Sequence, residues 1–151
     1  MKLVTFVCHG NICRSPMAEC IFNDLIEKRK LTHKYYSISR ATSREEIGSP
    51  IYPPARRILD KYNVSYSNRQ AKQLTYQEYK DSHIVLCMDN RNIVNIYRLI
   101  GGSDFDKKIH KLLDFCGGGD VADPWYTGDF NVTYDDILRG CNALIDYLEK
   151  E

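Results

Sequence analysis

The sequence predicts an α/β fold of three layers, in which helices cover both faces of a parallel β-sheet within a single domain of residues 1–151. Short segments rich in β-branched and aromatic residues alternate with segments of helical periodicity. Such alternation is typical of parallel sheets. A chain of 151 residues suits one hydrophobic core. Hydrophobic residues make up 43% and charged residues 27%, which favours a folded globular chain over a disordered one.

The first strand is predicted over Lys2 to Val7, where β-branched and aromatic side chains form a short apolar run. Ser15 followed by Pro16 is typical of a helix start, with serine as the cap and proline in the first turn. The apolar face of this helix is formed by Met17, Ile21, Leu25 and Ile26.

The later elements follow from the same signals. Strands are predicted over residues 35–41, 83–88 and 108–113. Pro53 and Pro54 open a second helix, Asp89 caps a third, and Val132 to Leu148 form a long last helix. Gly117 to Gly119 predict a mobile loop before the last helix.

Composition and cysteine spacing narrow the class of protein. The net charge of +1 provides no bulk attraction to nucleic acid or to anionic membranes. The longest apolar run, Leu3 to Val7, is too short for a membrane span or for the core of a signal peptide. The six cysteines are scattered without a Cys-x-x-Cys pair and the four histidines lie far apart, so we expect neither a disulfide framework nor a metal site. These features predict a cytoplasmic protein.

The loop that follows the first strand, Cys8 to Ser15, has the features of an anion-binding site. Ligands of parallel sheets bind beyond the carboxyl ends of the strands. Successive backbone N–H groups and a helix N-terminus attract an anion there, and the Arg14 guanidinium matches two phosphoryl oxygens. The same positive charge favours the thiolate of Cys8, which is a nucleophile. The alternative is a tight turn that holds a buried cysteine.

A proton donor for the leaving group is the second requirement of ester hydrolysis. Asp123 follows the glycine-rich loop, and Pro124 fixes the backbone directly after it. Trp125 and Tyr126 offer faces on which an aromatic substrate can pack. The alternative is an ordinary Asp-Pro turn with two surface aromatic residues.

Together, the two motifs closely resemble the low-molecular-weight protein tyrosine phosphatases. The resemblance rests on VCHGNICRSP at 7–16 and DPWY at 123–126, with support from ATS at 41–43, AKQLT at 71–75 and LCMD at 86–89. It implies a four-stranded parallel sheet, no metal and no organic cofactor. It also implies hydrolysis of phosphotyrosine and small aryl phosphates, in which Cys8 forms a phosphocysteine, Arg14 and the loop amides bind phosphate, and Asp123 acts as general acid and then base.

The resemblance also assigns roles around these three residues. The phosphate-binding loop comprises His9, Gly10, Asn11, Ile12, Cys13 and Ser15. Within it, Asn11 and Ser15 match residues that shape the loop and tune the thiol, and Ser39 matches one that supports Asn11. Trp125 and Tyr126 match the aromatic wall of the substrate cleft. Cys13 matches a redox partner that captures oxidised Cys8 in a disulfide; alternatively it is only a small buried residue.

Two positions depart from the family pattern. Glu45 stands on the cleft wall where many relatives have an aromatic residue. With Glu46 it predicts an acidic rim that disfavours acidic residues beside the phosphotyrosine; alternatively both glutamates only solvate the loop. Arg69 stands where some relatives carry a histidine of the network around Asn11, and the sequence leaves that network open.

Three other functions match parts of the pattern. Phosphoarginine phosphatases resemble this chain but have threonine at the position of Ile12, whose bulk favours an aryl phosphate. Arsenate reductases of this fold need two further cysteines in the middle of the chain, where only Cys87 lies. A non-catalytic thiol- or phosphate-binding module has no need of Asp123. We therefore expect phosphotyrosine-containing proteins as partners, no nucleic acid or membrane, and a monomer, with weak dimerisation as the alternative.

Overall fold

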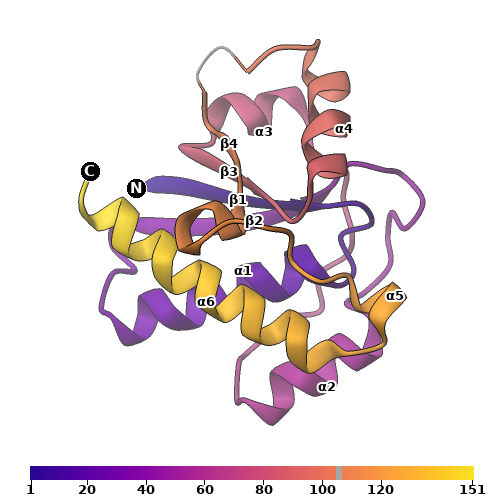
Figure 1. The fold of residues 1–151 in the computed structure, drawn as a ribbon, viewed down its shortest axis with the longest axis vertical. Coiled ribbons are helices and arrows are strands. Elements are labelled where there is room, and N and C mark those ends of the chain that lie inside the picture. The colour runs from indigo at the N-terminus through magenta and orange to yellow at the C-terminus, as the bar shows by residue number, and fades with distance from the viewer. Residues whose placement is uncertain (105–106) are drawn as a thin grey trace.

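A four-stranded parallel sheet forms the centre of the computed structural model, which describes residues 1–104 and 107–151 (Figure 1). The strands are β1 (Lys2–Cys8), β2 (Tyr35–Ala41), β3 (Ile84–Cys87) and β4 (Ile109–Lys111). Their order across the sheet is β2-β1-β3-β4, and every neighbouring pair is parallel. The predicted α/β class with a four-stranded parallel sheet is confirmed.

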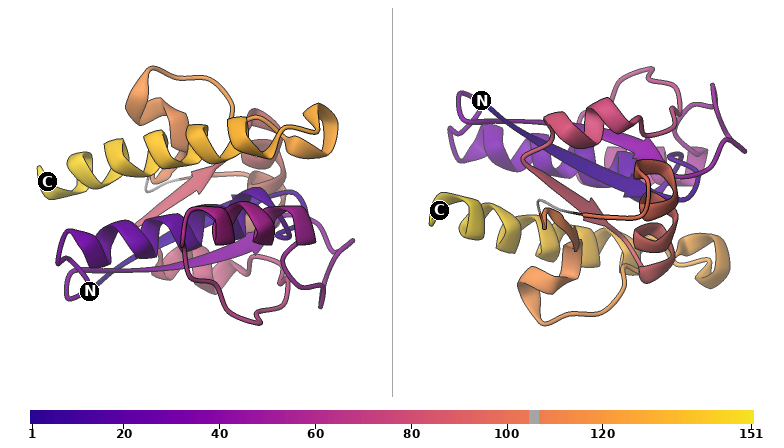
Figure 2. Two further views of the ribbon diagram at one scale, coloured as in Figure 1. Left: turned by 90° about the horizontal axis from the view of Figure 1, so that it is seen from below. Right: turned by 90° about the horizontal axis from the view of Figure 1, so that it is seen from above.

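Helices cover both faces of this sheet, as Figures 1 and 2 show. On one face α1 and α6 pack against each other, and α2 and the 3₁₀ helix η1 contact α6. On the other face α3 and α4 pack together, and α4 contacts β3 and β4. The helices and their bounds are α1 (Arg14–Lys28), α2 (Pro53–Lys61), α3 (Tyr76–Asp81), α4 (Asn90–Ile100), η1 (Leu112–Cys116), α5 (Pro124–Thr127) and α6 (Phe130–Glu149).

The central strand β1 is buried on both faces, since its side chains alternate between two apolar cores. Val4 and Phe6 belong to the larger core beneath α1 and α6, where the Phe6 ring contacts Phe22. Val7 belongs to the smaller core with Ile96 of α4. Packing from both sides fixes β1 in place, and with it Cys8 at its carboxyl end.

Four elements, α1, β4, α3 and α5, differ most from the sequence prediction. Helix α1 begins at Arg14 and is preceded by Cys13, so Ser15 is not the cap but lies in the first turn. The fourth strand spans only residues 109–111, because the chain turns into η1 at Leu112. The short helices α3 and α5 were not predicted, since six and four residues carry too little periodicity to detect.

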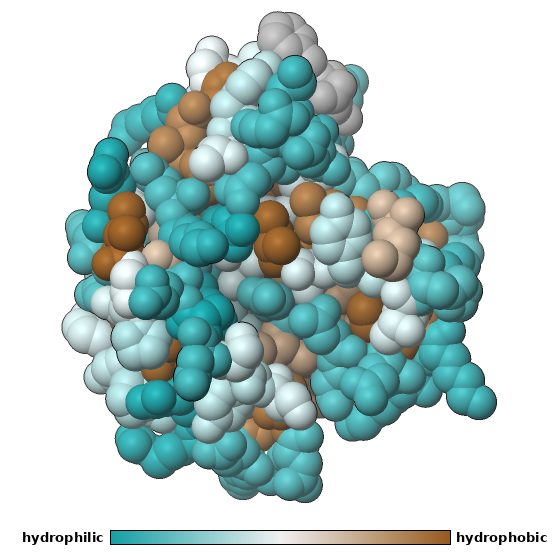
Figure 3. All heavy atoms as spheres, turned by 180° about the vertical axis from the view of Figure 1, so that it is seen from behind, coloured by the Kyte–Doolittle hydropathy of each residue, from teal (hydrophilic) through white to brown (hydrophobic). Residues whose placement is uncertain are grey.

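The surface visible from behind is mainly hydrophilic, with apolar side chains in small separate groups (Figure 3). Within the described ranges, no helix has the length and apolar character needed to cross a membrane.

The contact between α6 and η1 depends on a glycine. A Cβ atom built on Gly140 would lie 2.6 Å from Cγ of Leu112, which is fully buried. We expect Gly140→Ala to lower the free energy of unfolding by about 1–2 kcal/mol, because the clash outweighs the higher helix propensity of alanine. Urea unfolding measures this change.

The second substitution Leu112→Ala provides the control for this prediction. It removes the two Leu112 atoms that the new methyl group meets, at 2.6 and 3.1 Å, and leaves Leu113 Cδ2 at 3.1 Å, so Gly140→Ala should cost less in that background than in the original chain. Equal costs in both backgrounds would contradict the steric explanation.

Candidate active site

A cleft of about 1190 Å³ opens where the loops after β1, β2 and β3 meet. Most of the residues predicted to form the site line this one cleft, although they come from distant parts of the chain. They are Cys8, His9, Gly10, Ile12, Cys13, Arg14, Glu45, Asp123, Trp125 and Tyr126. The remaining predicted residues, Asn11, Ser15 and Ser39, are buried behind the loop.

The sulfur of Cys8 accepts hydrogen bonds at the end of β1. The backbone N–H of Asn11 donates to Sγ at 3.3 Å, and the Ser15 hydroxyl lies 3.0 Å from Sγ. Asn11 Nδ2 donates to that hydroxyl at 2.8 Å, so the hydroxyl proton has two acceptors, the sulfur at 3.0 Å and the more distant carbonyl of Arg40 at 3.4 Å. These donors stabilise a negative charge on Sγ, which is the state in which a thiol is a nucleophile.

Asn11 gives the loop its shape. Its φ of 59° lies in the left-handed region, which asparagine tolerates better than most residues. The side-chain oxygen of Asn11 accepts from the backbone N–H of Lys72 at 3.2 Å and from Arg69 Nη2, and Arg69 Nη1 donates to its carbonyl oxygen at 2.8 Å. Arg69 therefore completes the network that the sequence left open.

Within the described residues Ser39 makes no hydrogen bond to Asn11, and the support that the resemblance assigned to it stays a prediction. Its hydroxyl donates to Glu19 Oε1 at 2.6 Å. Burial raises the pKa of Glu19, while the Ser39 hydrogen bond and the charge of Arg69 oppose that rise. Arg69 supports Asn11 directly, while Ser39 contacts Glu19, whose carboxyl group interacts with the charge of Arg69.

The guanidinium group of Arg14 is held by hydrogen bonds on one side and is open to the cleft on the other. Its Nη1 donates to Asp89 Oδ2 at 2.9 Å and to the carbonyl of Val121 at 3.2 Å. Its Nη2 lies 3.4 Å from Asp123 Oδ2, and Nε has no partner among the described residues. Nε and Nη2 form the side of the guanidinium that can bind two oxygens of one phosphoryl group.

The charges around Arg14 also keep it ionised. Burial acts to lower the pKa of its guanidinium, but the negative charges of Cys8 and the two carboxylates outweigh burial and raise the pKa above its usual value. Asp89 was missed as a site residue in the sequence, where it was interpreted only as a helix cap. Asp89 caps the helix and also holds Arg14, because its Oδ1 accepts from the backbone N–H of Asn92 while its Oδ2 accepts from Arg14. Its position directly beyond the third strand was the available signal.

Asp123 projects toward Arg14 from the residue before α5. Its Oδ1 accepts from the backbone N–H of Trp125 at 3.0 Å, so its other oxygen faces the cleft and the guanidinium. Its side chain is 30% exposed, which leaves it accessible to a bound substrate.

Aromatic side chains form one wall of the cleft. The ring of Trp125 lies 5.5 Å from that of Tyr52, measured between centroids, and Tyr126 and Ile12 line the same cleft. Tyr52 was missed in the sequence. It is fixed to the phosphate-binding loop by a hydrogen bond from its backbone N–H to the carbonyl of Ile12 at 2.8 Å. No local sequence pattern predicts this contact, because the two residues lie 40 positions apart.

The two cysteines of the loop differ in environment. Burial, followed by the negative charges of Cys8 and Asp123, raises the pKa of Cys13 well above its usual value. Cys13 is therefore poorly suited to act as a nucleophile, which leaves Cys8 as the candidate of the pair. Both are free thiols, and the protective disulfide between them stays a prediction. In the part of the chain that the structure describes, no three His, Cys, Asp or Glu side chains gather to hold a metal ion.

Fold and site together define a class of enzyme: the phosphatases that use a cysteine thiolate as nucleophile, with an anion-binding loop, an arginine and a carboxylic acid around it. Residues 3–151 match the family model described as low molecular weight phosphotyrosine protein phosphatase. The chain belongs to the low molecular weight protein-tyrosine-phosphatase family.

Named relatives agree with this assignment. The low molecular weight protein-tyrosine-phosphatase YfkJ of Bacillus subtilis (strain 168) is 37% identical over 154 residues, which cover 100% of this chain and 98% of that protein. PtpA of Staphylococcus aureus (strain Newman) is 35% identical and covers 98% of this chain, with 94% of its own length matched. The predicted family is confirmed.

Solved structures resemble the fold over nearly the whole chain. The crystal structure of YfkJ has a TM-score of 0.94 at 36% identity and covers 99% of this chain and 96% of its own. That of a Drosophila arginine phosphatase has a TM-score of 0.88 at 27% identity and covers 99% and 98%. Because one fold serves both named activities, the choice between them depends on the cleft.

Arg69→Ala removes two of the donors to the buried Asn11. We expect kcat/KM for an aryl phosphate to fall about tenfold or more, because a lost hydrogen bond to a charged donor costs about 1.5–3 kcal/mol and the loop loses its shape. Steady-state kinetics measures the change. Arg69→Lys keeps the charge without the planar fork and should fall in between, whereas wild-type activity of Arg69→Ala would contradict this support.

Proposed function

We propose that this protein hydrolyses phosphotyrosine in proteins through a phosphocysteine intermediate on Cys8. The observation that supports this most directly is the convergence of three groups in one cleft. These groups are the hydrogen-bonded sulfur of Cys8, the unanchored side of Arg14, and the carboxyl group of Asp123. The cytoplasmic location and the monomeric state stay predictions from the sequence.

The first step transfers the phosphoryl group to the enzyme. The Cys8 thiolate attacks phosphorus while the bond to the phenolic oxygen breaks, and protonated Asp123 gives its proton to that oxygen. Arg14 and the loop N–H groups hold the equatorial oxygens, whose charge they stabilise most strongly in the transition state.

The second step restores the enzyme. Asp123, now a carboxylate, takes a proton from a water molecule that attacks phosphorus, and the sulfur–phosphorus bond breaks. The electron pair returns to Cys8 as the thiolate, which the Ser15 hydroxyl and the Asn11 N–H stabilise as a leaving group. Inorganic phosphate then leaves the cleft.

The walls of the cleft favour an aromatic phosphate ester. Tyr52, Trp125 and Ile12 present aromatic and apolar surfaces to the group that carries the phosphate. A phenyl ring packs on such faces, whereas the guanidinium of phosphoarginine also needs acceptors for its N–H groups. Arginine phosphatase activity is nevertheless the second candidate, because an arginine phosphatase shares the fold.

Peptides of one sequence that carry phosphotyrosine, phosphoserine or phosphoarginine test this proposal. We expect kcat/KM for phosphotyrosine to exceed the other two by about 100-fold or more, since an aryl ester gains both the aromatic contacts and a better leaving group. Higher kcat/KM for the phosphoarginine peptide would overturn the proposal in favour of the second candidate.

A further inference from the structure

The face of α4 that borders the active-site cleft carries two arginines. Arg91 and Arg98 are seven residues apart, which places them on the same side of the helix about 10.5 Å from each other along its axis. Val94 and Asn95 lie between them, and all four residues line the cleft. The helix is anchored in the fold by the buried residues Asn92 and Ile96.

Among the described residues that line the cleft, these two arginines are the guanidinium groups without an ion pair, whereas Arg14 is paired. Within residues 1–104 and 107–151, Arg91 has no hydrogen bond or ion pair, and Arg98 has only a 3.4 Å hydrogen bond to Asn95. Every carboxylate that lines the cleft has a partner. The pairs are Asp89 and Asp123 with Arg14, Asp120 with Lys111, Glu45 with His9, and Glu46 with Ser49.

The strand order separates the arginines from the glutamates. Glu45 and Glu46 follow β2, and α4 follows β3, while β1 with the phosphate-binding loop lies between these two strands. One side of the catalytic loop is therefore acidic and the other basic. The acidic rim predicted from the sequence is only one wall of the cleft.

We infer that the stripe Arg91, Val94, Asn95 and Arg98 is a docking site for an acidic segment of the phosphoprotein substrate, on one side of its phosphotyrosine. Two carboxylates three residues apart in a polyproline II segment lie about 9.3 Å apart on the same side, which matches the separation of the arginines. Val94, which is 50% exposed, would contact the aliphatic part of the segment. This inference rests on the proposed function.

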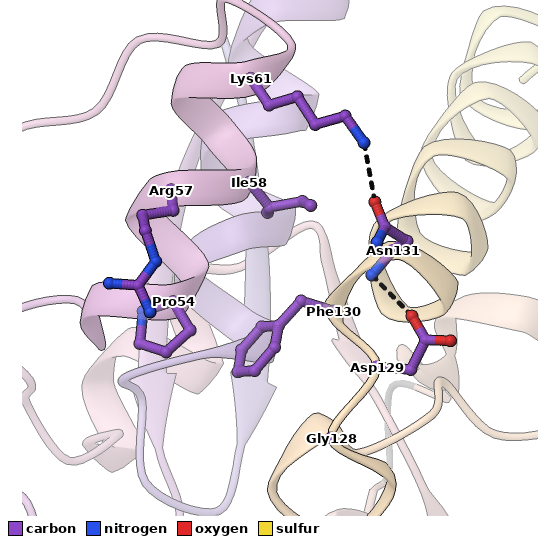
Figure 4. A pocket seen from close by; sticks show the side chains of 8 residues that line it. All are labelled: Pro54, Arg57, Ile58, Lys61, Gly128, Asp129, Phe130 and Asn131. Atoms are coloured by element: carbon purple, nitrogen blue, oxygen red, sulfur yellow. Dashed lines mark hydrogen bonds between the residues drawn. The ribbon is translucent and has the colours of Figure 1, made fainter.

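A second hollow, of about 530 Å³, lies between α2 and the start of α6, but its charges are largely engaged (Figure 4). Lys61 reaches across from α2 and donates to Asn131 Oδ1 at 3.2 Å, and the Asp129 carboxylate accepts from the N–H groups of Asn131 and Val132. Arg57 of α2 lines this hollow and not the cleft, so it is a matched control for the arginines of α4.

The experiment compares phosphotyrosine peptides of equal length. One carries two glutamates three residues apart on the amino side of the phosphotyrosine, another carries them on the carboxyl side, and a third carries glutamines. We expect one of the two acidic peptides to have a kcat/KM about five- to tenfold above that of the glutamine peptide. This is the gain expected from two exposed ion pairs. The advantage should shrink as ionic strength rises from 0.02 to about 0.3 M.

The double substitution Arg91→Ala and Arg98→Ala should abolish this advantage, and Arg57→Ala should preserve it. Replacing both arginines of α4 by glutamate should reverse the preference toward a peptide with two lysines. If all three peptides had equal kcat/KM, or if the advantage survived in the double variant, the docking site would be wrong while the phosphatase activity stood. No turnover of any phosphotyrosine peptide would overturn the proposed function and this inference with it.

Discussion

Cys8→Ser is expected to lower the turnover of an aryl phosphate by at least about 10⁴-fold, as is typical when an enzyme loses its nucleophile. A serine hydroxyl is a far weaker nucleophile than a thiolate, and the Ser15 hydroxyl and the Asn11 N–H that contact the sulfur of Cys8 favour a negative charge there. No second side chain can replace it, because the raised pKa of Cys13 keeps that thiol neutral. Steady-state hydrolysis of phenyl phosphate measures the loss.

Binding provides the control for this loss. The Cys8→Ser chain retains Arg14 and the loop N–H groups, so a phosphotyrosine peptide should still bind with a dissociation constant within a few-fold of the KM of the original chain. Arg14→Ala should lose both binding and turnover. Turnover above about 1% of the original in the Cys8→Ser chain would show that another group is the nucleophile.

The central part of the fold could be predicted because its signals are local. The strand β1 is a continuous apolar run, and β2 was predicted over the residues that the structure assigns to it. The fourth strand was predicted too long, because the apolar residues Leu112 and Leu113, which begin η1, directly follow residues 109–111 and extend the apparent strand. Helix α3 has only six residues and depends on a capping box between Thr75 and Glu78.

The residues of the site also differ in how local their sequence signals are. The loop from Cys8 to Ser15 is continuous in sequence, so its chemistry could be interpreted from neighbouring residues. Its supports come from elsewhere: Arg69 reaches Asn11 across 58 positions, and Asp89 reaches Arg14 across 75. Such contacts follow from the order of the strands, which the alternation of elements does not specify. For this reason the sequence left the support of Asn11 by Arg69 open.

Asp89 and Asp123 both contact Arg14, yet only one is suited to proton transfer. Both oxygens of Asp89 are engaged, one by Arg14 and the other by the backbone N–H of Asn92. Asp123 has one oxygen on the N–H of Trp125 and the other at the longer distance of 3.4 Å from Arg14. A phosphoryl group bound to Nη2 of Arg14 would therefore lie next to a carboxyl oxygen of Asp123, and not of Asp89.

Asp123→Asn is consequently expected to lower kcat/KM for phenyl phosphate by about 10²–10⁴-fold, the usual contribution of a general acid, but for p-nitrophenyl phosphate by only about tenfold. A poor leaving group needs the proton as its bond to phosphorus breaks, and a good one leaves as the anion. Because kcat/KM reports the formation of the phosphocysteine, the later need for a base does not obscure the comparison.

Asp89→Asn is the matched control, since asparagine also caps a helix and the change removes one carboxylate from Arg14. It should lower kcat/KM for both substrates by the same factor, because it weakens the positioning of the guanidinium and not the delivery of a proton. A series of aryl phosphates with leaving phenols of increasing pKa measures this difference. Compared with the original chain, log kcat/KM should fall more steeply with leaving-group pKa in Asp123→Asn, but not in Asp89→Asn. An equal slope in both variants would mean that the proton comes from another group.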